Sequence, residues 1–315
     1  MTTTRQFDGG KLRHLLTLDG LPRATLEGLL ERAQQLAVDA YGGTALRHAL
    51  AGKAVCTLFF EPSTRTRSSF SLAAQRLGAD LLNFDASTAS TTKGEADLDT
   101  LKTLEAMGVH AFVVRHKRDG AVAELADAAQ PGTVLLNAGD GRSNHPTQGL
   151  LDMLTLRQAK GDDFSKLKVV IVGDVKHSRV ARSDLHALRA LGCGEIRVCG
   201  PASLLPDDGT LDGCIVGDDF DAMIEGVDAA MMLRLQRERM AEGLVASLED
   251  YHRDYGLDAA RLRRASPDAI VMHPGPMNRG IEITSEVADG AQSRVLRQVA
   301  NGVAVRMAVL EALLG

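Results

Sequence analysis

The chain has 315 residues, which is more than one typical domain holds and fits two domains. Hydrophobic residues make up 44% and charged residues 24% of it, as in ordinary globular proteins, and no apolar run approaches the roughly 20 residues that would span a bilayer. The net charge of -5 and the absence of tryptophan argue against a nucleic-acid partner and against base stacking.

The beginning of the chain and its cysteines fit a cytoplasmic protein. Residues 1–10 lack the apolar core of a signal peptide. The cysteines are Cys56, Cys193, Cys199 and Cys214. They are not in C-x-x-C spacing, so we assign no structural zinc site and no metal.

The first part of the chain is predicted to be helical. Apolar residues recur at helical spacing through residues 12–51, and Pro22 suits the first turn of a helix. We expect this region only to pack against the rest of the protein.

The polar stretch from Ser63 to Arg67 suits a phosphate. It follows an apolar run, residues 54–60, that is typical of a buried parallel strand, and it precedes the helical pattern of residues 70–77. The first N–H groups of a helix lack partners within the helix and carry the positive end of its dipole, so they bind anions. The hydroxyl and guanidinium groups add donors. The alternative is a helix capped by Ser or Thr, with solvated arginines.

Further alternation of strands and helices follows. Strands are expected at 79–84, 111–114 and 134–137, and helices at 98–107 and 122–129. The polar loop 86–95 has almost nothing to bury, and Lys93 in it is by pattern an ordinary solvated lysine.

Two side chains follow strand ends in this region. Arg115 comes directly after a strand, where open α/β sheets bind ligands, so it is placed like Arg65. His145 follows the next strand end and precedes a helix that begins near Thr147. It should lie close to the two arginines, although a single histidine is more often an ordinary surface or core residue. His116 is expected to be structural.

A second α/β series begins with a strand at 168–174. It resembles the opening of a dinucleotide-binding unit but lacks G-x-G-x-x-G, so we exclude NAD and expect no cofactor. Arg179 in the following turn suits a carboxylate. Arg234 follows a later strand, 229–233, and is either a carboxylate clamp or part of a charged helix start.

Six motifs, in order along nearly the whole chain, resemble those of the aspartate and ornithine carbamoyltransferases. They are Ser63-Thr64-Arg65-Thr66-Arg67, Lys93-Gly94-Glu95, His145-Pro146-Thr147-Gln148, Arg234-Leu235-Gln236, Met272-His273-Pro274-Gly275-Pro276 and Asn278-Arg279-Gly280-Ile281-Glu282. The fourth and fifth match the aspartate branch, since the ornithine branch has an acidic residue with Ser-Met-Gly and a His-Cys-Leu-Pro instead. One departure is Ala89, where the family usually has Ser, and whether Ser90 replaces that hydroxyl is open.

The resemblance implies a fold and a reaction. The fold is α/β, with two domains that are each a parallel β-sheet flanked by helices, and with the active site in the interdomain cleft. Residues 1–148 would bind carbamoyl phosphate, with the helix 291–315 packing back on them, and residues 149–290 would bind aspartate. The α-amino group of L-aspartate would attack the carbonyl of carbamoyl phosphate, as in de novo pyrimidine biosynthesis. Positioning and aimed donors would supply catalysis without a covalent intermediate.

The resemblance also implies a role for each matched residue. The phosphate would be held by Ser63, Thr64, Arg65, Thr66, Arg115 and a neighbouring subunit's Lys93. The carbonyl oxygen would be polarised by Thr66, Arg115 and His145. The carbamoyl NH₂ would be bound by Gln148 and the Pro274 carbonyl, beside Gly275. The carboxylates of aspartate would be bound by Arg179, Arg234 and Gln236, with Lys93 and Gly275 nearby. Glu61 would pair with Arg179 and Arg239 and orient them.

The resemblance also has implications for assembly, and two alternative functions stay open. We expect a homotrimer with shared sites, because the matching family loop around Lys93 acts across a subunit boundary. Asn278 to Glu282 resemble the short bacterial form, which often associates with dihydroorotase or its inactive relatives, and a regulatory chain is a further candidate partner. The alternative functions are carbamoyl transfer to another amino acid such as ornithine, and an inactive scaffold subunit for dihydroorotase.

Overall fold

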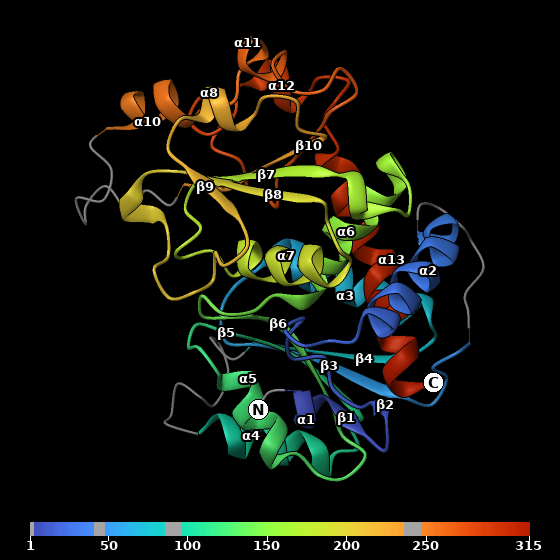
Figure 1. The fold of residues 1–315 in the computed structure, drawn as a ribbon. Helices are drawn as coiled ribbons and strands as arrows, with labels where there is room; N and C mark the ends of the chain where they lie inside the picture. The colour runs from blue at the N-terminus through green and yellow to red at the C-terminus, as the bar shows by residue number, and fades with distance from the viewer. Residues whose placement is uncertain (1–2, 41–47, 86–95, 236–246) are drawn as a thin grey trace. The chain divides into compact units, whose positions relative to one another are not determined.

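The computed structural model describes residues 3–40, 48–85, 96–235 and 247–315. The chain divides into two compact units (Figure 1). The first unit comprises Met1–Leu154 and Val299–Gly315, and the second comprises Thr155–Gln298. Each unit has its own parallel sheet.

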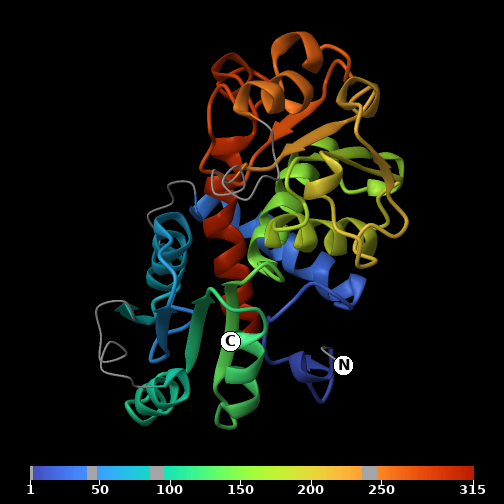
Figure 2. The ribbon, with the colours of Figure 1, turned by 90° about the vertical axis from the view of Figure 1, so that its left-hand side faces the viewer.

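The sheet of the first unit has four parallel strands in the order β4-β3-β5-β6. The strands are β3 (Ala54–Phe59), β4 (Asp80–Asp85), β5 (Ala111–His116) and β6 (Val134–Asp140). The helices are α1 (Thr3–Gln6), α2 (Arg23–Ala40), α3 (Thr64–Arg76), α4 (Asp97–Ala106), α5 (Ala121–Ala128), the first part of α6 (Pro146–Lys160) and most of α13 (Val295–Leu314). Figure 2 shows β5 and β6 side by side and pointing the same way.

Helices α4 and α5 cover one face of this sheet. Their apolar side chains, including Leu101 and Val122, form one buried cluster with Leu58 of β3 and Phe112 of β5. Every residue of β5 and β6 is buried. A continuous apolar run is what a parallel strand covered on both faces requires, so these strands fall close to their predicted positions.

The N-terminal segment differs from its prediction. Within the described part of residues 12–51, only Arg23–Ala40 is helical, and β1 (Phe7–Asp8) and β2 (Lys11–Leu12) form a small antiparallel pair. Residues after β2 run along β6, where the Leu15 N–H donates to Leu135 O at 3.0 Å. The helical prediction for residues 12–22 is therefore wrong, because the open edge of β6 needs hydrogen-bond partners that a helix could not supply.

The second unit contains a five-stranded parallel sheet in the order β11-β10-β7-β8-β9. The strands are β7 (Lys168–Val172), β8 (Glu195–Cys199), β9 (Ile215–Gly217), β10 (Ala229–Met232) and β11 (Ile270–Met272). The helices, including two short 3-10 turns, are η2 (Phe164–Lys166), α7 (Arg179–Ala190), η3 (Ala202–Leu204), α8 (Phe220–Met223), α10 (Leu248–Tyr255), α11 (Ala259–Leu262) and α12 (Ser285–Ala288).

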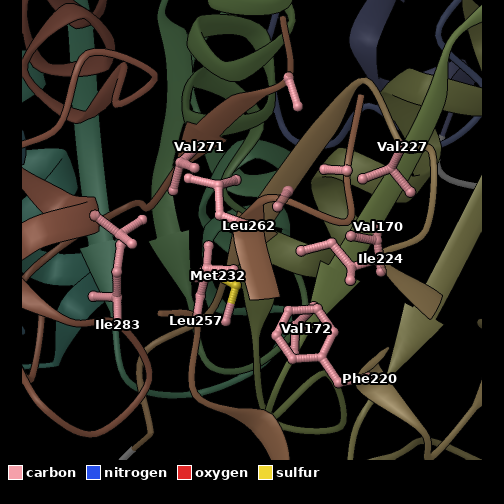
Figure 3. Packing of buried hydrophobic residues seen from close by; sticks show 14 of the residues in the cluster. Val170, Val172, Phe220, Ile224, Val227, Met232, Leu257, Leu262, Val271 and Ile283 are labelled. Atoms are coloured by element: carbon pink, nitrogen blue, oxygen red, sulfur yellow. The ribbon is translucent and has the colours of Figure 1, made fainter. Parts of the chain in front are cut away.

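One face of this second sheet carries a large apolar core (Figure 3). Val170 and Val172 of β7 and Met232 of β10 project into it, as the two-residue period of a strand requires. Phe220 and Leu262 come from the short helices that cover this face. Two units, each with a parallel sheet flanked by helices, confirm the predicted fold class.

Most of helix α13 packs within the first unit. It lies beside α2 (Figure 1), and the Arg32 guanidinium donates to Glu311 Oε1 at 2.8 Å. Among the described residues, no helix has both the length and the apolar character needed to cross a membrane.

In both sheets, successive strands are added first on one side of the strand that begins the series and then on its other side. The reversal lies between β3 and β5 in the first sheet and between β7 and β10 in the second. At such a switch point, the connections leave the carboxyl ends of neighbouring strands in opposite directions and open a crevice for ligands. Ser63, Arg179 and Arg234 follow these strand ends, and Arg115 is the second-last residue of β5.

Candidate active site

The start of α3 is built to leave its first turn available to an anion. Ser63 is the N-cap residue, yet its side chain makes no capping hydrogen bond. Its hydroxyl donates instead to Thr66 Oγ1 at 3.0 Å, and Thr66 is buried. The Thr66 hydroxyl therefore keeps its own proton for a second acceptor. The alternative of an ordinary Ser-capped helix does not describe this turn.

Arg115 lies next to this turn because of the strand register. It pairs with Phe59, the last residue of β3, and its carbonyl accepts from Phe60 N–H at 2.9 Å. The buried guanidinium donates to Ala138 O at 3.0 Å and to Glu61 Oε1 at 3.1 Å. Two fixed acceptors hold the charge at the carboxyl edge of the sheet, beside the start of α3.

Glu61 thus has Arg115 as a partner, which the sequence did not indicate. Its predicted pairing with Arg179 joins the two units and stays a prediction. Arg239, its other predicted partner, lies outside the described residues.

His145 sits at the start of α6. A turn closed by the hydrogen bond from Asp140 N–H to Asn144 O, at 3.1 Å, precedes it, and Pro146 occupies the first helical position, where its missing N–H costs nothing. His145 is 4% exposed. His145 follows the end of β6, as predicted, whereas Arg115 is the second-last residue of the neighbouring strand β5, which runs two residues further than predicted.

Gln148 lies in the first turn of α6, and its amide is held by the same helix. Its Nε2 donates to both carboxylate oxygens of Asp152, at 3.1 Å each. Asp152 is fully buried. The sequence reasoning missed Asp152, although its position four residues after Gln148 places the two side chains on one face of the helix.

In the second unit, two arginines follow strand ends. Arg179 is the first residue of α7, whose N-cap Ser178 accepts from Ala181 N–H at 3.1 Å. Arg234 is exposed, two residues after β10. The structure does not describe Gln236, nor Lys93 of the first unit.

A buried histidine and a buried glutamate shape the loop that contains Pro274 and Gly275. His273 Nδ1 accepts from Gly275 N–H at 2.8 Å, so in the neutral ring Nε2 carries the proton and donates to Glu282 Oε1 at 3.2 Å. Glu282 also accepts from Asn278 N–H at 2.6 Å. Gly275 has φ of 64°, in the left-handed region that favours glycine.

This loop is tied to the Arg234 segment. The Asn278 side chain donates to Leu235 O at 2.8 Å, so the fourth and sixth motifs are neighbours in space. His273 and Glu282 stand within motifs that the sequence singles out, but only the structure shows that they hold this loop.

Neither a metal site nor a reactive cysteine is found among the residues that the structure describes. Within the described ranges, no group of three or more His, Cys, Asp or Glu side chains could hold a metal ion. The four cysteines are free, and burial raises the pKa of Cys56 to about 12, which keeps that thiol protonated and unreactive.

Comparison with known proteins identifies the family. A family model described as the carbamoyl-P binding domain of aspartate/ornithine carbamoyltransferase matches residues 13–158, and one described as the Asp/Orn binding domain matches residues 165–313. The chain belongs to the aspartate/ornithine carbamoyltransferase family. The resemblance seen in the six motifs is thereby confirmed.

Relatives in this family align with the chain from end to end. The aspartate carbamoyltransferase catalytic subunit of Xanthomonas campestris pv. campestris (strain B100) is 78% identical over 315 residues, which is 100% of each chain. That of Stenotrophomonas maltophilia (strain K279a) is 76% identical, over 99% of this chain and 100% of its own.

Solved structures of both branches share the fold. Aspartate transcarbamoylase from Trypanosoma cruzi, in complex with carbamoyl phosphate and aspartate, has a TM-score of 0.85 at 32% identity and covers 97% of this chain and 98% of its own. Ornithine carbamoyltransferase from Thermus thermophilus has a TM-score of 0.84 at 28% identity and covers 96% of this chain and 99% of its own. The fold alone therefore does not separate the two branches.

Proposed function

We propose that this carbamoyltransferase acts as an aspartate carbamoyltransferase catalytic chain. It transfers the carbamoyl group from carbamoyl phosphate to the α-amino group of L-aspartate and releases N-carbamoyl-L-aspartate and phosphate. The observation that carries the proposal is the 78% identity, over the whole of both chains, to the Xanthomonas campestris catalytic subunit.

The first unit binds carbamoyl phosphate in this proposal. Ser63, Thr64, Arg65 and Thr66 hold the phosphate at the start of α3, where backbone N–H groups and the helix dipole favour an anion. Arg115 is supported in this role by its two fixed acceptors, because a donor that is already held needs no reorganisation when charge develops.

The tetrahedral oxyanion forms when the amine attacks the carbonyl. Thr66, Arg115 and His145 stabilise its oxygen, and the spare hydroxyl proton of Thr66 supports that role. The leaving phosphate is a candidate acceptor for the proton of the amine, so no protein group is assigned as general base. The carbamoyl NH₂ is bound by Gln148 Oε1 and the Pro274 carbonyl.

The second unit binds aspartate. Arg179, Arg234 and Gln236 hold its two carboxylates, since a guanidinium can bind a carboxylate through two parallel hydrogen bonds. The bond from Asn278 to Leu235 O supports a joint role for the Arg234 segment and the Pro274–Gly275 backbone. In this proposal residues 1–148 with 291–315 and residues 149–290 are the two substrate domains, and Glu61 orients Arg179 and Arg239.

Assembly and setting belong to the same proposal. The chain forms a homotrimer in which Lys93 completes a neighbour's site, and dihydroorotase and a regulatory chain are the candidate partners. Its product feeds de novo pyrimidine biosynthesis. Four free cysteines support a reducing, cytoplasmic setting.

An acceptor panel tests the function. The purified chain is given carbamoyl phosphate with L-aspartate, L-ornithine or an acylated derivative of ornithine, and the carbamoylated product is measured colorimetrically. We expect product with aspartate only. Product with ornithine would move the chain to the other branch, and no product with any acceptor would favour an inactive scaffold subunit.

A further inference from the structure

Arg306 carries a charge that is buried inside the first unit. The residue is 3% exposed, and its guanidinium carbon lies 4.9 Å from the centre of the Phe70 ring on α3. A Cβ at Gly302, four residues earlier on α13, would collide with Arg306 Nη1. The helix therefore makes room for the guanidinium rather than directing it to solvent.

Two charges of the candidate site act on this guanidinium. Burial lowers the pKa of Arg306 to about 9, the Asp152 carboxylate opposes that shift, and the nearby Arg115 adds to it. At neutral pH Arg306 is therefore still protonated. A buried cation needs a buried anion to compensate it, and Asp152, fully buried on α6, serves as one.

The same carboxylate fixes the orientation of Gln148. An ionised carboxylate only accepts hydrogen bonds, and both Asp152 oxygens accept from Gln148 Nε2 at 3.1 Å. The amide nitrogen therefore faces Asp152, and Oε1 of the same amide points away from it. An amide held in this way presents an acceptor to its ligand.

We propose, building on the function proposed above, that Arg306 and Asp152 are positioning residues that present Gln148 Oε1 to the substrate and so select a carbamoyl group over an acetyl group. Carbamoyl phosphate has an NH₂ group where acetyl phosphate has a methyl group. The NH₂ group donates to Gln148 Oε1, whereas the methyl group leaves that oxygen without a hydrogen bond in a buried site.

The substitution Asp152→Asn tests the orientation while keeping the shape of the side chain. An asparagine both donates and accepts, so the Gln148 amide can turn over and present its nitrogen. We expect kcat/KM for carbamoyl phosphate to fall about tenfold, the size of one lost hydrogen bond. The competitive inhibition constants of acetyl phosphate and inorganic phosphate should stay within about twofold, since neither ligand uses the amide oxygen.

Two further variants separate orientation from stability. Glu105→Gln is the matched control, because Glu105 is another buried carboxylate of this unit that accepts a backbone hydrogen bond, from Gln130 N–H at 2.9 Å, without touching Gln148. It should keep the wild-type preference. The double variant Asp152→Asn with Arg306→Met removes both charges together, so neither is left buried alone, and it should lose the preference as Asp152→Asn does.

Each result decides the inference. A folded Asp152→Asn or double variant with wild-type preference would overturn it, as would an equal loss toward carbamoyl phosphate and acetyl phosphate. A double variant that does not fold assigns the pair to stability alone and also overturns it. If the wild-type chain forms no carbamoyl-aspartate, the proposed function itself fails.

Discussion

Ser63 shows how a single hydroxyl can be diverted from its usual structural role. At most helix starts, a serine in this position would accept from a first-turn N–H group. Here the hydroxyl donates to Thr66 instead, and the first turn of α3 keeps its capacity for an anion. Beside this turn, Arg115 is held in place by hydrogen bonds to Glu61 and Ala138.

Arg65→Ala should act mainly on the transition state. Arg65 stands in the exposed first turn of α3, where the leaving phosphate gains charge in the proposed reaction. We expect kcat to fall by ~10²-fold or more, as for a lost oxyanion donor, in steady-state assays with both substrates. Arg76→Ala, at the far end of the same helix, is the control and should keep kcat. An unchanged kcat with only a raised KM for aspartate would contradict the assignment.

Arg234→Lys should weaken aspartate binding and spare carbamoyl phosphate. A lysine point charge cannot replace a forked guanidinium, so we expect a loss of ~1–3 kcal/mol in aspartate binding. Titration with each substrate separates the two effects, and Arg263→Lys, an exposed arginine of the same unit, is the control. A large loss of carbamoyl phosphate binding would show that Arg234 has another role.

At the scale of elements, the N-terminal segment is the informative case. Leu15, Leu16 and Leu18 fit a helical pattern, yet Leu15 pairs with β6, and His14 Nδ1 accepts from Leu135 N–H at 3.0 Å. The apolar spacing could not reveal this, because the need for partners arises from the open edge of a strand more than a hundred residues later.

His14→Asn should reduce the loss of stability on mild acidification. Burial, and then the charge of Arg13, lower the pKa of His14 from 6.5 to about 4, so the unfolded chain binds a proton below pH 6.5 that the folded protein refuses. We expect wild type to lose roughly 2 kcal/mol of unfolding free energy through this group between about pH 7 and about pH 5. Asparagine keeps an acceptor for Leu135 N–H but cannot take the proton. Urea unfolding at both pH values measures the difference, and equal losses in the two proteins would rule this linkage out.

The parts that could be predicted from the sequence are those with a local cause. The apolar runs of β3, β5 and β6 located buried parallel strands, and the strand-end rule brought Arg115 and His145 to one edge. The short exposed strand β9 and the strand β11 were missed. Glu282 and Arg306 were missed as positioning groups because their effect depends on contacts between distant elements, which no spacing in the sequence expresses.

At the scale of the whole molecule, the two sheets repeat one design. In each sheet the first strand of the series becomes an inner strand, and the order of strand addition changes side next to it. Each unit therefore carries its candidate ligand groups at the carboxyl ends of neighbouring strands. The proposed reaction assigns one substrate to each unit. In the proposed trimer, Lys93 of a neighbouring chain would complete the site.

Mixed trimers should regain activity that neither parent variant has. Lys93→Ala and His145→Ala each leave only defective sites in a homotrimer. In any mixed closed ring, one chain with intact His145 receives an intact Lys93 from its neighbour, and that site is whole. Dissociating and reassociating the mixture should restore part of the activity, while either variant treated alone stays inactive. If mass measurement finds hybrid trimers without activity, Lys93 acts within its own chain or not at all.

The division of the first unit has a consequence for how the protein is made. Residues 299–315 belong to that unit but leave the ribosome only after all of Thr155–Gln298. When the second unit has just left the ribosome, Arg306 has not yet emerged. Asp152 then lacks the Arg306 charge, and the Phe70 ring lacks the guanidinium that packs on it. The first unit therefore matures last although most of it is translated first, and the second unit, which is continuous in sequence, can fold ahead of it.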